Sequence, residues 1–331
     1  MTWRMQSNKI VILLVVLLAL TFLIKAVAPA HSVKALKNSD LRLEGVLVYH
    51  RYSDYGAWNG QLWMIELSTG RIAHINRDWK GMISPINAHF SADGESMVFM
   101  GSAAGLLEND WDVFVSHWNG KNWAEPINLT GPNGKRDEDP KFSLDGSKIV
   151  YKEDGVLTTM LADGRDKTYL TPGEPESSIP YFLPNGRDII FERHDKIMIY
   201  KNGKVSELWN DPVLRAYYPI GVDEKKYLYT QVQANHHDRL MWGYYDGSES
   251  KPLSFNSTQW DTSDPFPYKD GSRYIFYVSG DFSVHEGGYN LMIADIVRNR
   301  VASMGIINAQ ANSDLEELGP AWSAKGKFPI Q

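Results

Sequence analysis

Acidic side chains gather just ahead of a recurring proline–aromatic motif at four places in this 331-residue chain. These carboxylates are Asp137, Glu138 and Asp139, then Glu174 and Glu176, then Asp261 and Asp264, and finally Glu316 and Glu317. Carboxylates held close together repel one another, so a converging set favours a bound divalent cation such as calcium, or a basic partner. The alternative is a set of separate, solvated residues at turns and strand starts. The elements that carry these residues decide between the two.

The histidine spacings and the absence of cysteine and of a nucleophilic-serine motif limit the kinds of catalysis that the sequence could support. The nine histidines include His89, the pair His236-His237 and His285, and none has a metal-ligand spacing such as H-E-x-x-H. The absence of cysteine excludes disulfides, thiol chemistry and a cysteine zinc site. No G-x-S-x-G motif occurs, which excludes the nucleophile elbow of an α/β-hydrolase. We therefore predict no catalytic residue from motifs.

A group of tryptophans is a second candidate site. Trp111, Trp118 and Trp123 lie close together in the sequence, beside the small-residue segment Gly101 to Asp110, which would suit a contact loop. Exposed rings would stack on sugars. Buried rings would instead pack between sheets, because each large aromatic side chain buries roughly 150–250 Å². Both interpretations stay open from the sequence.

One phrase recurs along the chain and predicts the elements that position these residues. It reads DEDPKFSLDGSKIVY from Asp137, with weaker copies from Ser84, Ser178, Tyr218, Asp264 and Leu318. Each copy combines a proline, an aromatic or apolar residue, a turn, and a strand of alternating apolar residues. Spacings of roughly 40–55 residues are typical of propellers or solenoids. The absence of a convincing amphipathic helix favours a propeller of four-stranded antiparallel sheets.

Counting the copies gives six blades, of which the first and the last are incomplete. Leu43 to Asn76 supplies three strands, and the proline–aromatic strand that should precede them is missing. Gly319 to Gly326 supplies that element alone. We therefore predict an all-β, six-bladed propeller over residues 43–331, closed by a C-terminal strand that completes the N-terminal blade. The alternative is a truncated seventh blade.

The N-terminus indicates export. Arg4 and Lys9 precede a mostly apolar run, Ile10 to Ile24, and Ala28-Pro29-Ala30 fits a signal-peptidase site. Residues 1–30 are thus predicted to be a secretory signal, or an uncleaved signal anchor in the inner membrane, and residues 31–42 a polar linker. The propeller would then be periplasmic or secreted. The formal net charge of −6 argues against a nucleic-acid surface.

The phrase at Asp137 resembles the repeat of TolB-like β-propellers. The longer stretch from Asp112 to Gly146 is similar to the version found in periplasmic, envelope-associated propellers, and the likeness extends over about Leu43 to Gly326. The resemblance implies that the proline–aromatic strand is innermost and that the loop before it opens at one mouth of the central channel. We expect no N-terminal α/β domain like that of TolB, so partner contacts made through that domain do not carry over.

The expected function is therefore a non-catalytic binding or scaffold propeller of the bacterial cell envelope, holding a protein or polysaccharide partner at the channel mouth. The expected contact residues are Asp137, Glu138, Asp139, Glu176, Asp261, Asp264, Glu316 and Glu317. We expect no cofactor beyond a divalent cation at this mouth. The alternative is a polysaccharide lyase that uses His89, Tyr181, Arg215 and Tyr217 in the channel. A third alternative is a sensor or assembly factor anchored by Ile10 to Ile24.

Overall fold

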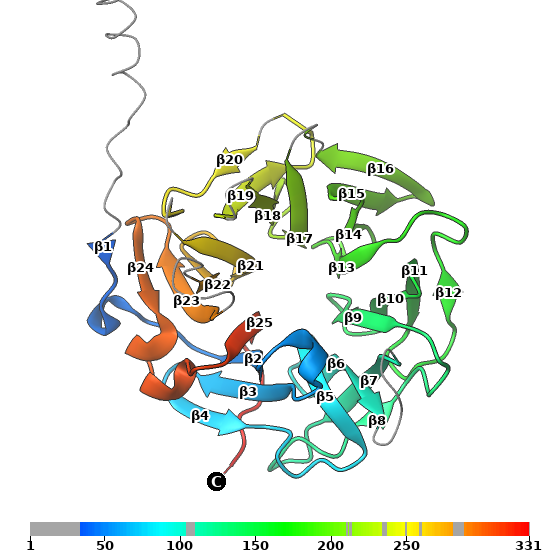
Figure 1. The fold of residues 1–331 in the computed structure, drawn as a ribbon, viewed down its shortest axis with the longest axis horizontal. Coiled ribbons are helices and arrows are strands. Elements are labelled where there is room, and N and C mark those ends of the chain that lie inside the picture. The colour runs from blue at the N-terminus through cyan, green and yellow to red at the C-terminus, as the bar shows by residue number, and fades with distance from the viewer. Residues whose placement is uncertain are drawn as a thin grey trace, which may run out of the picture. The chain divides into compact units, whose positions relative to one another are not determined.

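Six antiparallel sheets stand around a central axis as the blades of a propeller (Figure 1). The computed structural model describes residues 34–103, 110–209, 211, 214–233, 237–248, 250–257, 260–280 and 288–330. Ala35–Gln331 forms one unit. The predicted signal, including the run Ile10 to Ile24, lies outside the described residues. Among the residues described, no helix is long and apolar enough to cross a membrane.

The strands of each blade are given from the innermost outward. Blade one is β25 (Glu316–Ser323), β2 (Val46–Tyr52), β3 (Gln61–Glu66) and β4 (Arg71–His74). Blade two is β5 (Met82–Phe90), β6 (Ser96–Ala103), β7 (Asp112–His117) and β8 (Ile127–Asn128). Blade three is β9 (Asp137–Phe142), β10 (Lys148–Glu153), β11 (Val156–Leu161) and β12 (Thr168–Tyr169).

The other half of the ring follows the same order. Blade four is β13 (Ser178–Phe182), β14 (Ile189–Arg193), β15 (Lys196–Lys201) and β16 (Lys204–Trp209). Blade five is β17 (Arg215–Gly221), β18 (Lys226–Val232), β19 (Arg239–Tyr244) and β20 (Lys251–Pro252). Blade six is β21 (Asp261–Pro267), β22 (Tyr274–Gly280), β23 (Asn290–Asp295) and β24 (Arg300–Ser303), with β1 (Lys34–Ala35) at its outer edge. Short 3-10 helices are η2 (Asn38–Asp40), η3 (Tyr55–Ala57), η4 (Met304–Ile306) and η5 (Ala309–Ala311).

The ring closes as the sequence predicts. β25, from the C-terminal end of the propeller, pairs antiparallel with β2, from Val46 opposite Ser323 to Tyr52 opposite Glu316. Each innermost strand also contacts the next one around the axis, including β25 with both β21 and β5. The prediction of six blades, the first of which is built from both ends of the chain, is therefore confirmed. Every blade in the ring has a neighbour on both sides (Figure 1).

Apolar side chains between adjacent blades hold the ring together. Between blades two and three, Val98 and Val115 pack with Phe142, Ile149 and Tyr151 in one buried cluster. A similar cluster joins blades four and five. These residues alternate along their strands, so each sheet presents one apolar row to each neighbour. Burial contributes roughly 1.5–3 kcal/mol for each large apolar side chain.

The hairpin turns explain the Asp-Gly element of the repeat. In blade three Gly146 has φ +73°, which a residue with a Cβ rarely adopts. The Asp145 carboxylate accepts hydrogen bonds from the Ser143 hydroxyl at 2.6 Å and the Ser147 N–H at 3.0 Å. The turn is therefore fixed by local side-chain bonds as well as by glycine.

Two segments that flank the propeller strands pack against it. Leu36 and Leu41, from the segment that the sequence suggests as a linker, are buried, and the Leu36 N–H donates to the Val301 carbonyl at 2.8 Å. After β25, the Lys327 carbonyl accepts a hydrogen bond from Trp123 Nε1 at 3.2 Å, and Phe328 is buried. The residues after β25 thus join blade one to blade two.

A buried carboxylate in blade three gives a prediction for acid stability. Burial would raise the pKa of Glu153, but hydrogen bonds from Lys135, Lys167, Tyr169 and Tyr151 outweigh it and lower the pKa to about 2. A carboxylate whose folded pKa lies below its unfolded value of about 4.5 stabilises the fold at higher pH. We expect the free energy of unfolding to fall as pH drops from about 4.5 to 2.

Glu153→Gln should cost about 2 kcal/mol at neutral pH, because several charge-assisted hydrogen bonds are weakened. It should also flatten the fall in stability between pH 4.5 and 2. Chemical denaturation across this pH range measures both effects. The matched control is Glu207→Gln, at an exposed ion pair with Lys196, which should cost under ~1 kcal/mol. Equal pH profiles for the native protein and Glu153→Gln would contradict the prediction.

Candidate functional site

One residue of each innermost strand turns toward the channel: in five blades it is the residue before the repeated proline, and in blade two it is Asn87, which precedes Ala88. Each innermost strand shifts register at this point, and the residue there has φ between +48° and +58°. A β-bulge bends its strand and re-aims a side chain. The six residues, which we call the channel ring, are Asn87, Asp139, Ile179, Tyr218, Asp264 and Gly319. All six line one small recess of about 40 Å³ at the axis of the propeller.

The floor of this recess is made by side chains two positions farther along the innermost strands. The His89 ring meets the Tyr181 ring at 5.9 Å and the Phe266 ring at 6.4 Å between centroids, which joins blades two, four and six across the axis. The Lys141 ammonium lies 5.1 Å from the centre of the Tyr181 ring. The channel is therefore narrowed by packed rings below the channel ring.

Lys141 is the one lysine among the residues that line the recess. Its side chain is buried, with only 5% of the residue exposed. Burial lowers the pKa of Lys141 to about 8, while the carboxylates of Asp139 and Asp264 act in the opposite direction. In the part of the chain that the structure describes, the Lys141 ammonium makes neither a hydrogen bond nor an ion pair.

The two histidines near Lys141 are uncharged. Burial, with the nearby Lys141 charge, lowers the pKa of both His50 and His89 to about 3. Their Nδ1 atoms accept backbone N–H groups, from Asn87 at 3.3 Å for His50 and from Phe142 at 3.2 Å for His89. Both imidazoles therefore orient the innermost strands.

Of the eight carboxylates predicted at the mouth, Asp139 and Asp264 line the recess. Asp139 accepts a hydrogen bond from the Asn87 amide at 2.8 Å. Asp264 accepts one from the Gly319 N–H at 3.0 Å and one from the Ser263 hydroxyl at 2.9 Å. Burial raises the pKa of Asp264. The fold thus brings together one carboxylate from blade three and one from blade six.

Two further predicted carboxylates, Glu138 and Glu176, belong to an ion-pair network at blades three and four. Lys152 bonds to Glu138 and, at 3.0 Å, to Glu176. Arg136 bonds to Glu138 at 2.9 Å, and Tyr55 on the η3 turn donates to Glu138 at 3.4 Å. Glu138 and Glu176 therefore hold neighbouring blades together at the mouth.

Glu174 and the remaining predicted carboxylates are also engaged by the chain. Glu174 pairs with Arg193 at 2.7 Å. Asp137 accepts from Asn133 at 2.9 Å, and burial raises its pKa to about 6. Asp261 accepts from the Tyr289 hydroxyl, Glu316 accepts from the Tyr289 N–H at 2.8 Å, and Glu317 pairs with Arg51 at 2.9 Å. Across the described residues, no group of three or more carboxylate or histidine side chains has a geometry that could hold a metal ion.

Comparisons with known proteins agree with this architecture. No protein-family model matches the sequence, and no curated protein does. Among solved structures, TolB from Acinetobacter baumannii superimposes with a TM-score of 0.63 at 15% identity, over 84% of this chain and 66% of that one. The fold is a TolB-like β-propeller.

Two further structures show that this fold is shared by different proteins. A chain of Kuenenia stuttgartiensis hydrazine synthase matches with a TM-score of 0.65 at 10% identity, over 87% of this chain and 48% of that one. A chain of a nidogen/laminin complex matches with a TM-score of 0.59 at 12% identity, over 85% and 99%. This TolB-like propeller thus spans about two thirds of the TolB chain and about half of the hydrazine synthase chain. These identities establish the fold alone.

The His/Tyr/Arg set expected for a lyase is divided between two levels of this TolB-like propeller. His89 and Tyr181 belong to the floor, below the channel ring. Tyr217 and Arg215 precede the channel ring on β17, and both bond to Asp195, with Arg215 at 3.9 Å. An acid–base pair must reach the same substrate atom region within hydrogen-bond distance. In the described part of the chain, no hydrogen bond or ring contact joins His89 or Tyr181 to Tyr217 or Arg215.

The tryptophan group is mainly structural. Trp111 is 1% exposed and stacks on Trp58 at 4.3 Å between ring centroids. Trp123 is buried against Trp118 at 5.8 Å. Core packing is therefore the correct interpretation for Trp111 and Trp123. The loop after Gly101 lies largely outside the described residues, as do His236 and His285.

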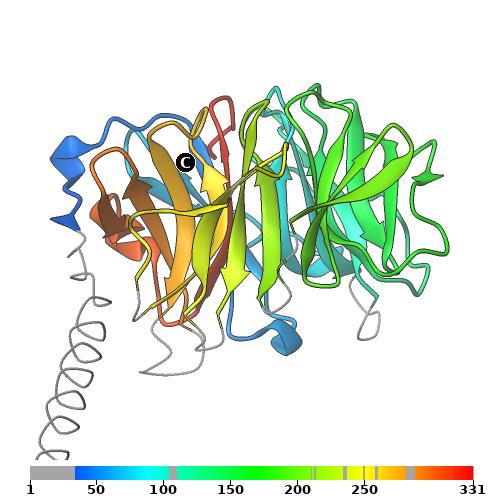
Figure 2. The same cartoon turned by 90° about the horizontal axis from the view of Figure 1, so that it is seen from above.

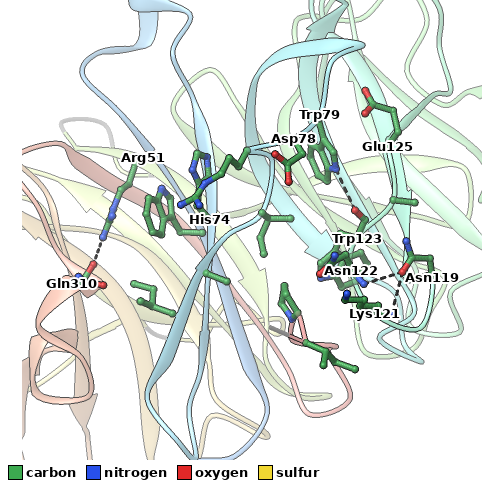
Figure 3. A pocket seen from close by; sticks show the side chains of 18 of the residues that line it. Arg51, His74, Asp78, Trp79, Asn119, Lys121, Asn122, Trp123, Glu125 and Gln310 are labelled. Carbon is green, nitrogen blue, oxygen red and sulfur yellow. Dashed lines mark hydrogen bonds between the residues drawn. The ribbon is translucent and has the colours of Figure 1, made fainter.

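A second cavity, of about 1120 Å³, lies around the outer strand β4 and was not predicted from the sequence. Figure 3 shows Arg51 and Gln310 on one side of His74, which ends β4, and Trp79, Trp123 and Asn119 on the other. The Arg51 guanidinium lies 4.3 Å from the centre of the Trp63 ring, and the same ring stacks on His74 at 4.9 Å between centroids. Trp79 donates to the Trp123 carbonyl at 3.3 Å. The aromatic groups here are largely engaged by the chain itself.

Proposed function

We propose that this chain is an extracytoplasmic, non-catalytic binding propeller of the bacterial cell envelope, which seats a protein partner at the channel mouth. The observation that carries the proposal is the recess itself. It is polar at the channel ring, narrowed below by packed rings, and about 40 Å³ in volume. A recess of that size accepts a single side-chain group, because one water-sized probe needs roughly 10–15 Å³.

The rim around the recess supports recognition of a partner surface. Tyr218 in the channel ring is 39% exposed, and Tyr55 on the η3 turn is 50% exposed. Figure 2 shows the η3 turn projecting from one face of the ring. Tyrosines that combine an apolar ring with a polar hydroxyl are enriched at protein interfaces. The likeness to a chain of a nidogen/laminin complex shows that a propeller of this fold occurs within a protein–protein complex.

The location outside the cytoplasm rests on the sequence. Arg4 and Lys9, the apolar run Ile10 to Ile24, and Ala28-Pro29-Ala30 have the order of a secretory signal. A mass measurement of the mature protein tests cleavage after Ala30. An intact N-terminus would favour the anchored alternative.

Photo-crosslinking from the rim tests the binding role. We would place p-benzoylphenylalanine at Tyr55, and as a control at Leu144, which is 64% exposed at the turn that follows β9. Because β9 runs from the mouth residue Asp137 to Phe142, Leu144 lies at the far end of that strand. We expect a specific protein adduct in envelope fractions from Tyr55 and none from Leu144.

A pair of substitutions in the recess refines this test. Asp139→Asn with Asp264→Asn should lower the yield of the Tyr55 adduct about tenfold, because hydrogen bonds to charged groups contribute about 1.5–3 kcal/mol each. If the probe at Tyr55 crosslinked a glycan and no protein, the partner would be a polysaccharide. The binding role itself would be contradicted if no adduct formed while the purified protein released unsaturated sugars from uronic-acid polymers.

A further inference from the structure

We propose that Lys141 is a built-in counter-ion, whose buried ammonium holds the place of a divalent cation beside Asp139 and Asp264 and keeps the recess free of metal. The proposal does not depend on the identity of any partner. It concerns which ions the recess admits.

The first support is the position of the ammonium. Lys141 is two residues beyond Asp139 on β9, and its side chain lines the same recess as the channel ring. The residue is only 5% exposed, and its ammonium lies 5.1 Å from the centre of the Tyr181 ring. A buried ammonium is costly unless opposite charges or an aromatic face compensate for lost water. Here the Tyr181 ring provides the aromatic face.

The second support is the charge balance of the recess. Asp139 and Asp264 are the carboxylates that line it, and each is held by hydrogen bonds from neighbouring blades. Their fields favour the charged form of Lys141, against the effect of burial. His50 and His89 nearby are uncharged, so they do not change this balance. Lys141 therefore offsets one of the two negative charges, and a free cation would meet its repulsion.

The third support is the supply of oxygen ligands that would remain without the lysine. Calcium takes six to eight oxygen ligands from carboxylates, amides and waters. The recess offers the carboxylates of Asp139 and Asp264, the amide of Asn87 and the hydroxyl of Tyr218. Replacing the ammonium by a third carboxylate would remove this partial neutralisation and convert the recess into a calcium site.

The decisive experiment compares calcium-dependent melting of the native protein and Lys141→Glu. At about 10 mM calcium chloride, against sodium chloride of equal ionic strength, the native Tm should stay unchanged. The Tm of Lys141→Glu should rise by about 3 °C or more, which fits a site of millimolar affinity. Lys148→Glu, an exposed site on the next strand of the same blade, adds the same charge outside the recess and should not respond.

Two more variants make every outcome informative. Adding Asp139→Asn and Asp264→Asn to Lys141→Glu should abolish the calcium response, since the ligands are removed. If Lys141→Glu fails to fold even with calcium, Lys141→Gln replaces it and should show a smaller rise. The proposal is overturned if the native protein and the folded Lys141 variant respond equally, or if neither responds. Either result leaves the crosslinking test of the partner unaffected.

Discussion

Deleting Gly319–Gln331 will remove most of the cooperative stability of the propeller. The deletion takes away most of β25, which is the innermost strand of blade one and pairs with β2 over its length. It also breaks the contacts of β25 with β5 and β21, so the ring opens at the channel. We expect a loss of about 5 kcal/mol or more, out of the ~5–15 kcal/mol that is typical of a folded domain. Thermal melting followed by circular dichroism should show a Tm lower by at least about 10 °C.

A shorter deletion separates closure from the packing of the tail. Removing Ala324–Gln331 keeps β25 but loses the buried Phe328 and the hydrogen bond from Trp123 to the Lys327 carbonyl. Its cost should be smaller, about 2–5 kcal/mol, as for the loss of one large buried side chain and its neighbours. An unchanged Tm after the longer deletion would show that β25 does not close the ring.

Breaking the ion pair between Arg51 and Glu317 should have the next largest effect. This pair links β2 to β25 at 2.9 Å, with 6% and 0% of the two side chains exposed. The Arg51 guanidinium also donates to the Tyr49 hydroxyl at 3.1 Å and to the Gln310 carbonyl. Removing either partner leaves a buried charge without compensation, which costs about 3–5 kcal/mol. Glu317→Leu and Arg51→Met should each lower the free energy of unfolding by this amount, measured in urea.

The double substitution provides the internal control. Arg51→Met with Glu317→Leu leaves no unpaired charge, so its cost should fall short of the sum of the single costs by at least about 1 kcal/mol. The exposed pair of Lys196 and Glu207 gives a reference, because surface ion pairs contribute little. Additive costs in the Arg51 and Glu317 cycle would mean that the two charges stabilise their strands independently.

Much of the fold could be predicted because the repeat is local. The Asp-Gly turn at Asp145-Gly146 and the alternation that follows it each need only a few consecutive residues. The missing strand before Leu43 and the surplus strand at Gly319 matched, which was enough to predict closure. The role of the segment around Leu36, which packs on blade six, had no such repeat to reveal it.

The candidate site was only partly predictable, because the β-bulge decides which side chains of each innermost strand point into the channel. In a regular strand, side chains alternate between faces, so a shift of one residue changes which of Glu138 and Asp139 lines the channel. The left-handed residue at Asp139 makes that shift, and the sequence does not state its φ. Lys141 could have been recognised by counting two residues onward from Asp139, once the bulge was known. The cavity around β4 is lined by six separate segments of the chain, so no local sequence pattern predicts it.

The sequence alone predicted the six sheets, their turns and the joining of the two ends. Each of these features is set by neighbouring residues and by the need to bury both faces of a sheet. Only the tertiary structure decided which acidic side chains line the recess at the axis. Most of them bond to arginine, lysine, tyrosine or backbone groups that are distant in sequence, and those pairings exist only after the blades have packed.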